Sequence, residues 1–399
     1  MNEKIPKSWK IKRLGDFLIS LPKSKLQSGL SDKTGYYNFY VCSQNILKSF
    51  YNEMSSPAVL FSTGGEAAVH YAIGEYSYST DVWATNFTGE IYDEYGFRLL
   101  EKDLEKINYS GFQGSGIKHL DKKFVKKLTY AIPPLSEQKK IASILTSVDE
   151  VIETTQKQID KLQDLKKATM NELLTKGIDH TEFKDSVLGR IPKSWEVVSI
   201  MDSNITLLDG DRGKEYPKEK DFTKSGYCLF LSAKNVTKNG FRFDETMFIS
   251  KDKDEKLGKG RLNRNDMIIT TRGTVGNIAQ YDRKVLFDFV RINSGMAIIR
   301  NQDERLSSDF LYHILSSEII TQQIEYLTFG SAQPQLTIGT LNELKIPIPQ
   351  ISEQLNIVQI LTSILKDIQN KKQKLTQTQS LKKSLMQDLL TGKVRVKVN

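Results

Sequence analysis

The chain has 399 residues, of which 39% are hydrophobic, and its formal net charge is +9. This length exceeds one ordinary hydrophobic core, so we expect two or three domains, and the basic excess favours a polyanionic partner such as nucleic acid. The only cysteines, Cys42 and Cys228, are far apart and are expected to be core residues, which argues against a secreted, disulfide-stabilised protein. The sequence contains no stretch of about 18 apolar residues. We therefore expect a cytoplasmic protein without a membrane span.

Similar segments occur twice along the chain, in the same order. IPKSW begins at Ile5 and again at Ile191, an offset of 186 residues. From Gly114 and Gly330 onward the offset is constant at 216, so the second copy is 30 residues longer (216 minus 186). The remaining pairs are VCSQNI from Val41 with LSAKNV from Leu231, VLFSTGGE from Val59 with IITTRGTV from Ile268, and GSGIKHL from Gly114 with GSAQPQL from Gly330. Each copy consists of a globular part followed by a long helical stretch.

The globular part of each copy contains short apolar runs separated by glycine and asparagine turns. Four runs are rich in β-branched and aromatic residues, which is typical of buried strands: YYNFYVC, YCLFLSA, DMIITT and GMAIIR. We therefore expect two mixed α/β domains. The runs do not predict the order of the strands in a sheet.

A long helix follows each globular part. The segments PLSEQKKIASILTSVDE from Pro134 and QISEQLNIVQILTSILKD from Gln350 place Ser136 and Ser352 where a helix N-cap belongs. Gly177 and Gly392 lie where the helices should end. Each helix therefore has roughly 40 residues and a length of about 60 Å.

Apolar residues in both helices alternate steps of four and three, which is the heptad spacing of a coiled coil. Thr155 and Lys371 interrupt the two seams at matching positions, and such polar positions tend to set the register of a helix pair. We expect the two helices to pair with each other in antiparallel orientation. The predicted seam residues are Ile141, Leu145, Val148, Ile152, Ile159 and Leu162 in the first helix, and Ile357, Leu361, Ile364, Ile368 and Leu375 in the second.

These observations predict an α+β protein with two globular mixed α/β domains, two long helices forming an antiparallel coiled coil, and a pseudo-twofold internal repeat. The predicted boundaries are 1–131 for the first globular domain, 132–178 for the first helix, 179–190 for a linker, 191–345 for the second domain, and 346–399 for the second helix and tail. Two alternatives remain open: each helix could pack on its own domain, or the seam could form a homodimer.

The sequence contains none of the usual catalytic or metal-binding patterns. The four histidines, His70, His119, His180 and His313, lack the spacing to a second histidine or a cysteine that would hold a metal ion. A phosphate-binding loop, a nucleophile elbow, a dinucleotide-binding fingerprint and the Asn-Pro-Pro-aromatic motif of amino-group DNA methyltransferases are all absent. We therefore expect a protein without metal or catalytic residues.

Residues suited to DNA contacts occur at matched loop positions of the two copies. Gln and Asn can make bidentate contacts to adenine in the major groove, and Arg can make them to guanine. By the alignment of VLFSTGGE with IITTRGTV, Arg272 corresponds to Thr63. Lysines near Lys214 could hold phosphates, although the neighbouring acidic residues favour a mixed-charge surface. The candidates are Gln44, Asn45, Thr63, Lys118, His119, Arg212, Lys214, Lys234, Asn235, Thr271, Arg272, Gln333 and Gln335.

The chain resembles the specificity subunit of a type I restriction-modification system. The similarity rests on the paired IPKSW segments, on the paired GS...L...IP...SEQ...I..IL stretches that end in LLT, and on FGSAQPQLTIGTLNELKIPIP from Phe329. It covers essentially the whole chain in the order domain, helix, domain, helix. The first copy has GSGIKHLDKK in place of the fuller GSAQPQLTIG, so its recognition loop is expected to differ in shape.

This resemblance implies a non-catalytic subunit with two target-recognition domains that each read one half of a split DNA site, while the helices act as a ruler. The implied partners are double-stranded DNA, two methyltransferase subunits and restriction subunits. No cofactor is implied for this chain. S-adenosylmethionine would bind the methyltransferase, which methylates adenine N6, and ATP and Mg would bind the restriction subunit, which cleaves DNA.

Two other classes of function remain open from the sequence. A coiled-coil scaffold joining two protein-binding domains fits the modest net charge and the near-neutral first helix. Strong, salt-dependent DNA binding would exclude such a scaffold. A nuclease with an unrecognised site would have to cleave DNA by itself in the presence of magnesium.

Overall fold

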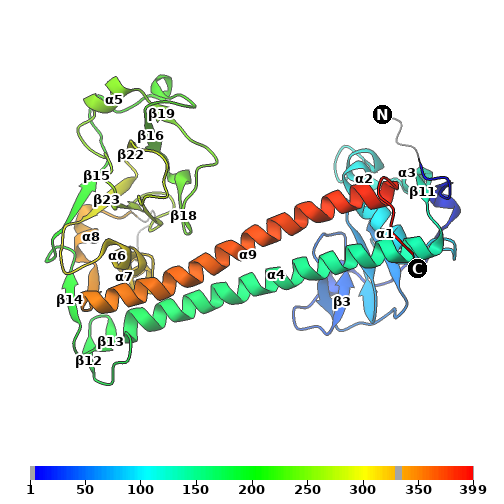
Figure 1. The fold of residues 1–399 in the computed structure, drawn as a ribbon, viewed down its shortest axis with the longest axis horizontal. Helices are drawn as coiled ribbons and strands as arrows, with labels where there is room; N and C mark the ends of the chain where they lie inside the picture. The colour runs from blue at the N-terminus through cyan, green and yellow to red at the C-terminus, as the bar shows by residue number, and fades with distance from the viewer. Residues whose placement is uncertain (1–4, 329–334, 399) are drawn as a thin grey trace. The chain divides into compact units, whose positions relative to one another are not determined.

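The structure is a computed structural model that describes residues 5–328 and 335–398. Its contacts divide the chain into two compact units: unit 1 comprises residues 1–158 and 371–399, and unit 2 comprises residues 159–370. Each unit holds one globular domain and part of each of two long helices (Figure 1). The predicted two-copy α/β plan with two long helices is confirmed.

Unit 1 contains a four-stranded antiparallel sheet of order β2-β8-β5-β6 and a three-stranded sheet of order β4-β3-β7. In the three-stranded sheet, β3 and β7 run parallel. The bounds are Leu18–Ser20 for β2, Tyr37–Tyr40 for β3, Leu47–Ser49 for β4, Ala58–Ser62 for β5, Val69–Ala72 for β6, Tyr76–Tyr78 for β7 and Val82–Phe87 for β8.

Unit 2 repeats this topology with β15-β23-β20-β21 and β19-β16-β22, and β16 and β22 again run parallel. The four apolar runs predicted to be strands are strands β3, β16, β20 and β23. The bounds are Ile205–Asp209 for β15, Cys228–Leu231 for β16, Phe248–Ile249 for β19, Met267–Thr270 for β20, Ile278–Gln280 for β21, Val290–Ile292 for β22 and Met296–Asn301 for β23.

Shorter elements complete each unit. Two-stranded pairs are β1 (Lys10–Arg13) with β11 (Thr129–Ile132), β9 (Phe112–Gln113) with β10 (His119–Leu120), β12 (Phe183–Ser186) with β13 (Gly189–Pro192), β14 (Glu196–Ser199) with β24 (Lys345–Ile348), and β17 (Val236–Thr237) with β18 (Gly240–Phe241). The short helices are α1 (Asp93–Lys102), α2 (Leu104–Gly111), α3 (Lys122–Lys127), α5 (Lys251–Lys256), α6 (Ser308–Leu315), α7 (Glu318–Thr328) and α8 (Ile338–Glu343). The hairpin of β12 and β13 occupies much of the segment 179–190 that was expected to be a linker, and the predicted domain boundaries stay predictions.

The long helices are α4, with 42 residues from Leu135 to Lys176, and α9, with 41 residues from Ile351 to Thr391. Both begin two residues earlier than predicted, so Ser136 and Ser352 lie inside the first turn and are not N-caps. In α4 the carbonyl of Pro134 already accepts the backbone N–H of Gln138 at 3.0 Å, which starts the helix before the serine. The predicted ends are confirmed, because Gly177 and Gly392 have φ values of 67° and 77°, the left-handed conformation that favours glycine after a helix.

The two helices pack against each other in antiparallel orientation within each unit. In unit 1, Leu145 near the start of α4 shares a core with Leu389 near the end of α9, and in unit 2, Leu174 near the end of α4 shares a core with Ile357 near the start of α9. The same cores include the sheets and short helices of the globular domains, so each helix also packs on a domain. Of the predicted seam residues, Ile141, Leu145, Ile159, Ile357, Leu361 and Ile368 are buried, and Val148, Ile152, Leu162, Ile364 and Leu375 are half-buried.

Gln138 and Gln354 attach the first turn of each long helix to its globular domain. Both side chains are buried, and each amide bonds to the backbone of the domain as both acceptor and donor. The partners are Tyr92 N–H at 2.8 Å and Glu90 C=O at 2.9 Å for Gln138, and Ser307 N–H at 2.8 Å and Arg305 C=O at 2.7 Å for Gln354. The repeated Ser-Glu-Gln sequence thus positions each domain on the start of its helix.

No helix in the described part of the chain is both long enough and apolar enough to cross a membrane.

Candidate nucleic-acid interface

In unit 1, the candidates Thr63, Lys118 and His119 lie on two neighbouring turns where β5 ends. This end of the four-stranded sheet, like its counterpart in unit 2, is called the candidate edge below. The turn after β5 contacts the chain around β10, because Leu120 N–H donates to Thr63 C=O at 3.0 Å and Gly65 N–H donates to Lys118 C=O at 2.9 Å. The Lys118 and His119 side chains are exposed. The structure therefore brings these candidates together where β5 ends.

The segment after β3 joins the same edge. Gln44 Nε2 donates to the carbonyl of Ala67 at 2.5 Å, which holds the glutamine against the turn after β5. The next residue, Asn45, is exposed. Gln44 and Asn45 thus belong to one surface with Lys118 and His119.

The two cysteines differ in their surroundings. Cys228 is fully buried, as predicted, and burial raises the pKa of its thiol to about 11. Cys42 is only half-buried and is therefore not a core residue, contrary to the prediction. Its thiol donates to the carbonyl of Asp81 at 2.9 Å. The same carbonyl accepts the hydroxyl of Thr63 at 2.6 Å, so both side chains brace the edge.

Unit 2 has the equivalent edge. Its backbone hydrogen bonds show that the alignment of VLFSTGGE with IITTRGTV is shifted by one residue. Leu336 N–H donates to Thr271 C=O at 3.1 Å, as Leu120 does to Thr63. Thr271 is therefore the counterpart of Thr63, and pairing Arg272 with Thr63 was wrong by one residue. Similar apolar runs can be aligned in neighbouring registers, whereas backbone hydrogen bonds specify one register. Arg272 and Gln335 adjoin this hydrogen bond, and both side chains are exposed.

Arg212 and Arg272 approach the same short loop of unit 2. The Arg212 guanidinium donates to Asp209 Oδ1 at 3.2 Å and to the carbonyl of Ser294 at 3.4 Å. A Cβ built on the neighbouring Gly295 would lie 3.9 Å from the Cβ of Arg272. Two exposed arginines thus flank the loop before β23, at the end of β20.

The loop that carries Arg212 and Lys214 is held by a carboxylate. Asp211 accepts backbone N–H groups of Gly213 at 2.7 Å, Gly258 at 2.8 Å and Lys259 at 3.2 Å. The hydrogen bond from Gly213 is the largest of the effects that hold the pKa of Asp211 below its usual range. This loop is therefore fixed in place before any ligand binds.

Two further candidates are buried, a third is paired with a carboxylate, and one lies outside the described residues. Asn235 is buried, and its amide donates to the carbonyls of Arg242 and Glu245, so it shapes its own loop. The Thr271 side chain is also buried. Lys234 is exposed but pairs with Glu245 at 3.0 Å. Gln333 lies outside the described residues.

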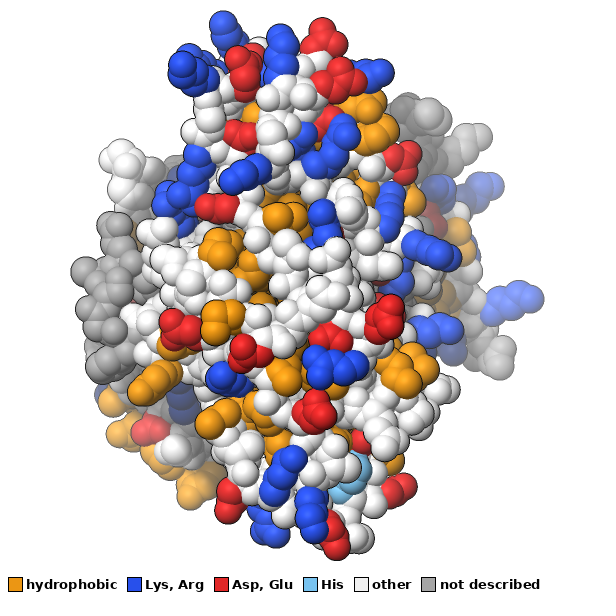
Figure 2. All heavy atoms as spheres, turned by 90° about the vertical axis from the view of Figure 1, so that its left-hand side faces the viewer, with side chains coloured by type: hydrophobic (Ala, Val, Ile, Leu, Met, Phe, Trp, Pro, Cys, Tyr) orange, Lys and Arg blue, Asp and Glu red, His pale blue; other side chains and the backbone are white. Residues whose placement is uncertain are grey.

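The lysines after Lys214 belong to a mixed-charge surface. Figure 2 views the molecule from the left-hand side of Figure 1. Lys and Arg side chains are interspersed with Asp and Glu over the upper part of this view, where Figure 1 places α5. Lys253 illustrates the mixing, because it lies 3.3 Å from Glu215 and 3.7 Å from Asp221. This part of unit 2 therefore offers little net positive potential for phosphates.

Sequence reasoning missed several lysines at the corresponding edge of unit 1. Lys23 and Lys25 are exposed in the segment after β2, which corresponds to the Arg212 loop after β15. Lys122 and Lys126 follow on α3, directly after β10. The run KKFVKK indicates this basic helix in the sequence, but the matching segment of the second copy, IGTLNE, contains no lysine.

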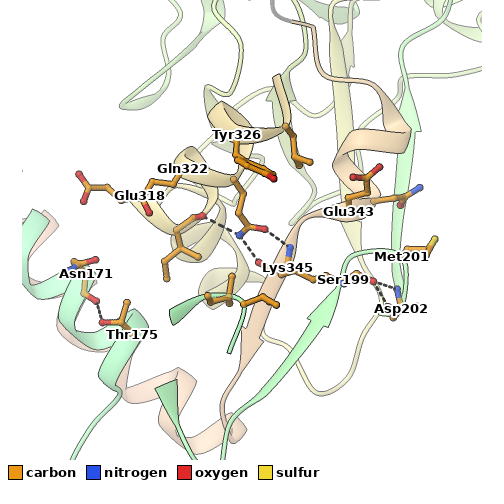
Figure 3. Close-up of a pocket in the computed structure, with 16 residues that line it drawn as sticks. Asn171, Thr175, Ser199, Met201, Asp202, Glu318, Gln322, Tyr326, Glu343 and Lys345 are labelled. Carbon is orange, nitrogen blue, oxygen red and sulfur yellow. Dashed lines mark hydrogen bonds between the residues drawn. The ribbon is translucent and has the colours of Figure 1, made fainter. Parts of the chain in front are cut away.

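A groove of about 590 Å³ lies within unit 2 between the end of α4, α7 and the segment before β24. Figure 3 shows Asn171 and Thr175 of α4 on one side, Glu318, Gln322 and Tyr326 of α7 above, and Met201 and Asp202 opposite. Many of its polar groups bond within the protein; for example, Gln323 both donates to and accepts from the backbone of Lys345, at 2.9 and 2.8 Å. Two of the lining residues are joined directly, because the Ser199 hydroxyl donates to the Asp202 carboxylate. Among the described residues, no group of three His, Cys, Asp or Glu side chains could hold a metal ion.

The model of a protein family described as "Type I restriction modification DNA specificity domain" matches residues 6–164 and 192–379. The chain belongs to this family. The two matched stretches correspond to the two copies, so the specificity-domain family assignment covers both units.

Curated relatives of the specificity-domain family match along the whole chain. The type I restriction enzyme MjaVIII specificity subunit of Methanocaldococcus jannaschii is 29% identical, over 99% of this chain and 95% of that protein. The type I restriction enzyme EcoDI specificity subunit of Escherichia coli is 21% identical, over 89% of this chain and 81% of that protein.

A solved structure shares the fold. The type I restriction-modification system S subunit from M. genitalium superposes with a TM-score of 0.65 at 16% identity, covering 98% of this chain and 97% of that one. Its agreement with the two-copy topology supports the fold alone.

Proposed function

We propose that this protein is the DNA-specificity subunit of a type I restriction-modification complex, and that each unit reads one half of a split duplex site. The observation that carries the proposal is the recurrence of one sheet edge in both units, each bearing exposed side chains suited to DNA. In unit 1 these are Gln44, Lys118 and His119, and in unit 2 they are Arg212, Arg272 and Gln335.

Different side chains on the same frame suit the reading of two different half-sites. Arginine makes bidentate contacts to guanine, and glutamine makes them to adenine. Because the backbone hydrogen bonds of Thr63 recur at Thr271, sequence preference can change at the exposed positions without loss of the frame. Binding one half-site also raises the effective concentration of the second unit at the other half-site.

The long helices are proposed to set the spacing of the two half-sites, and two methyltransferase subunits are proposed to bind this subunit. In that complex this chain contributes no catalysis. S-adenosylmethionine belongs to the methyltransferase, and ATP and Mg belong to any restriction subunit. This division of roles is supported by the family assignment and by the absence of a catalytic motif from the sequence.

The test is a map of DNA methylation. The chain is produced with a cognate type I methyltransferase subunit in a host without adenine methylation, and N6-methyladenine is located by long-read sequencing. A split motif with a constant gap is the expected result. If the purified complex forms and no methylated motif arises, the proposal fails and a protein-binding scaffold becomes the better explanation.

A further inference from the structure

Two lysines of unit 1 lie over one tryptophan at the candidate edge, and the charge of a third lysine acts on one of them. Lys122 and Lys126 are one turn apart on α3, and their Nζ atoms lie 5.2 and 5.9 Å from the ring centroid of Trp83. Burial foremost, and then the charges of Lys23 and Lys126, lower the pKa of Lys122. Lys23, Lys122 and Lys126 are called the lysine cluster below.

The positive charges of the lysine cluster are not balanced by neighbouring carboxylates. Among the described residues, none of its three members forms an ion pair with Asp or Glu, whereas Lys12 and Lys382 of the same unit do. Like charges one turn apart on a helix repel each other. An arrangement that costs stability in the free protein is one that a bound anion would relieve.

The lysine cluster is not required by the packing of α3. The counterpart of α3 in unit 2 is α8, and at the constant offset of 216 the buried Val125 corresponds to the buried Leu341. At the same offset, Lys122 and Lys126 correspond to Ile338 and Asn342. The apolar contact of the helix is therefore kept in both units, while the charges of Lys122 and Lys126 have no counterpart on α8.

The tryptophan beneath the lysine cluster is held firmly. Trp83 Nε1 donates to Ser20 Oγ at 2.9 Å, and the ring stacks on Phe61 with centroids 4.9 Å apart. α3 follows β10 directly, so the lysine cluster is continuous along the chain with Lys118 and His119. The lysine cluster thus lies against a side chain that is fixed in position, next to the residues proposed to face DNA.

We propose that the lysine cluster binds the backbone phosphate of DNA at the half-site read by unit 1, and that α8 of unit 2 makes no equivalent contact, because Ile338 and Asn342 replace Lys122 and Lys126. This inference rests on the proposed function. Phosphate contacts position a protein on the duplex without reading sequence. The lysine cluster therefore contributes affinity and orientation, and the choice of bases belongs to other residues of the edge.

The first experiment measures the salt dependence of binding. The complex of the full chain with its methyltransferase is titrated with a fluorescent duplex that carries the methylated motif, at several salt concentrations. The K122Q/K126Q variant should lower the slope of log affinity against log salt by about 2, because each lost phosphate contact removes about 0.9. The methylated motif should stay unchanged, and K122R/K126R should restore the slope.

The matched control is K123Q/K127Q, which removes the same charge from the same short helix at positions away from Trp83. Its slope should change by less than about half as much. Thermal unfolding of K122Q/K126Q should occur at the same temperature as the wild type or higher, because a repulsion has been removed. An equal loss of slope in both double variants would overturn the proposal, because it would reflect net charge alone.

The second experiment locates the phosphate. Single phosphates are replaced by uncharged methylphosphonates across both half-sites, and binding is measured for the wild type and for K122Q/K126Q. One or two replacements at a single half-site should weaken the wild type and leave the variant unaffected. Equal sensitivity of the variant would overturn this proposal alone, whereas a wild-type complex that does not bind its motif would overturn the proposed function as well.

Discussion

The carboxylate of Glu353 accepts a hydrogen bond from the indole N–H of Trp195 at 3.0 Å. The same side chain accepts the backbone N–H of Ile178 at 2.9 Å and lies 2.8 Å from Nε2 of His180. One acidic side chain of unit 2 therefore joins the repeated IPKSW segment, the start of α9 and the residues just after α4.

Unit 1 forms the same junction with different partners. Glu137 accepts the indole N–H of Trp9 at 3.2 Å, and Arg395, just after α9, donates to it at 2.8 Å. The Glu of the Ser-Glu-Gln sequence and the Trp of IPKSW are thus paired in both copies, although each pair is separated by more than 100 positions.

Replacing Glu353 by alanine is expected to lower the free energy of unfolding of the protein by about 2–3 kcal/mol, because buried donors lose their acceptor. Urea unfolding followed by circular dichroism measures the change. Glu172→Ala on the exposed side of α4, where the carboxylate pairs with Lys176, should cost less than about 0.5 kcal/mol. Equal losses in the two variants would show that the junction does not stabilise the fold.

The paired variant Leu145→Asp with Leu361→Asp should disrupt the packing of α4 and α9. Both leucines have 0% exposure, and an unpaired buried charge costs about 3–5 kcal/mol. Leu165→Asp with Leu381→Asp is the matched control, because these leucines are also related by the offset of 216 and are 51% and 53% exposed. Thermal melting should fall sharply only in the first variant. Similar melting of both would contradict the helix packing.

Stability should decline in mildly acidic solution because of His313. This side chain is 5% exposed, and burial foremost, with Lys166, lowers its pKa from 6.5 to about 4. Because the unfolded chain binds the proton more readily, stability from this group is complete above pH 6.5 and is lost as pH falls toward 4, by up to about 3 kcal/mol. Urea unfolding at pH 7.5 and 4.5 should show a smaller difference for His313→Gln than for the wild type. Identical pH profiles would refute this assignment.

Arg212→Ala should relax the recognised motif at one guanine position of the half-site read by unit 2. A bidentate arginine contact discriminates by about 1–3 kcal/mol against the wrong base. Asp209→Asn should have a smaller effect in the same direction, since Asp209 orients the guanidinium. Methylation mapping provides the readout, with Lys234→Ala as the control. Uniformly weaker methylation without relaxed specificity would indicate a phosphate contact.

Deleting residues 155–158 together with residues 371–374 should shorten the gap in the methylated motif. Four residues remove about 6 Å of helix, which corresponds to about two base pairs at roughly 3.4 Å each. Both half-sites should stay unchanged. The wild-type gap in the motif of this variant would contradict the proposed role of the helices as a ruler.

Much of the architecture could be predicted from local patterns. Heptad spacing indicated both long helices, and the glycines after them marked their ends, because a glycine that adopts a positive φ is a local requirement. The first residues of the helices were misplaced by two positions, since the carbonyl of Pro134 begins α4 before Ser136. The candidate edge was predicted only in part. Asn235 has a residue type suited to DNA, but its surroundings bury it.

The sequence by itself determined the two-copy plan, the four buried strands, the helix seam and the family. All of these follow from repeated segments and from the spacing of apolar residues along the chain. Only the tertiary structure decided which Glu meets which Trp, that Arg272 corresponds to Gly64, and that Lys122 and Lys126 of α3 lie over Trp83 of β8. These relationships join residues far apart in the chain. They depend on the hydrogen-bond register and the packing of the folded sheets, which no local pattern specifies.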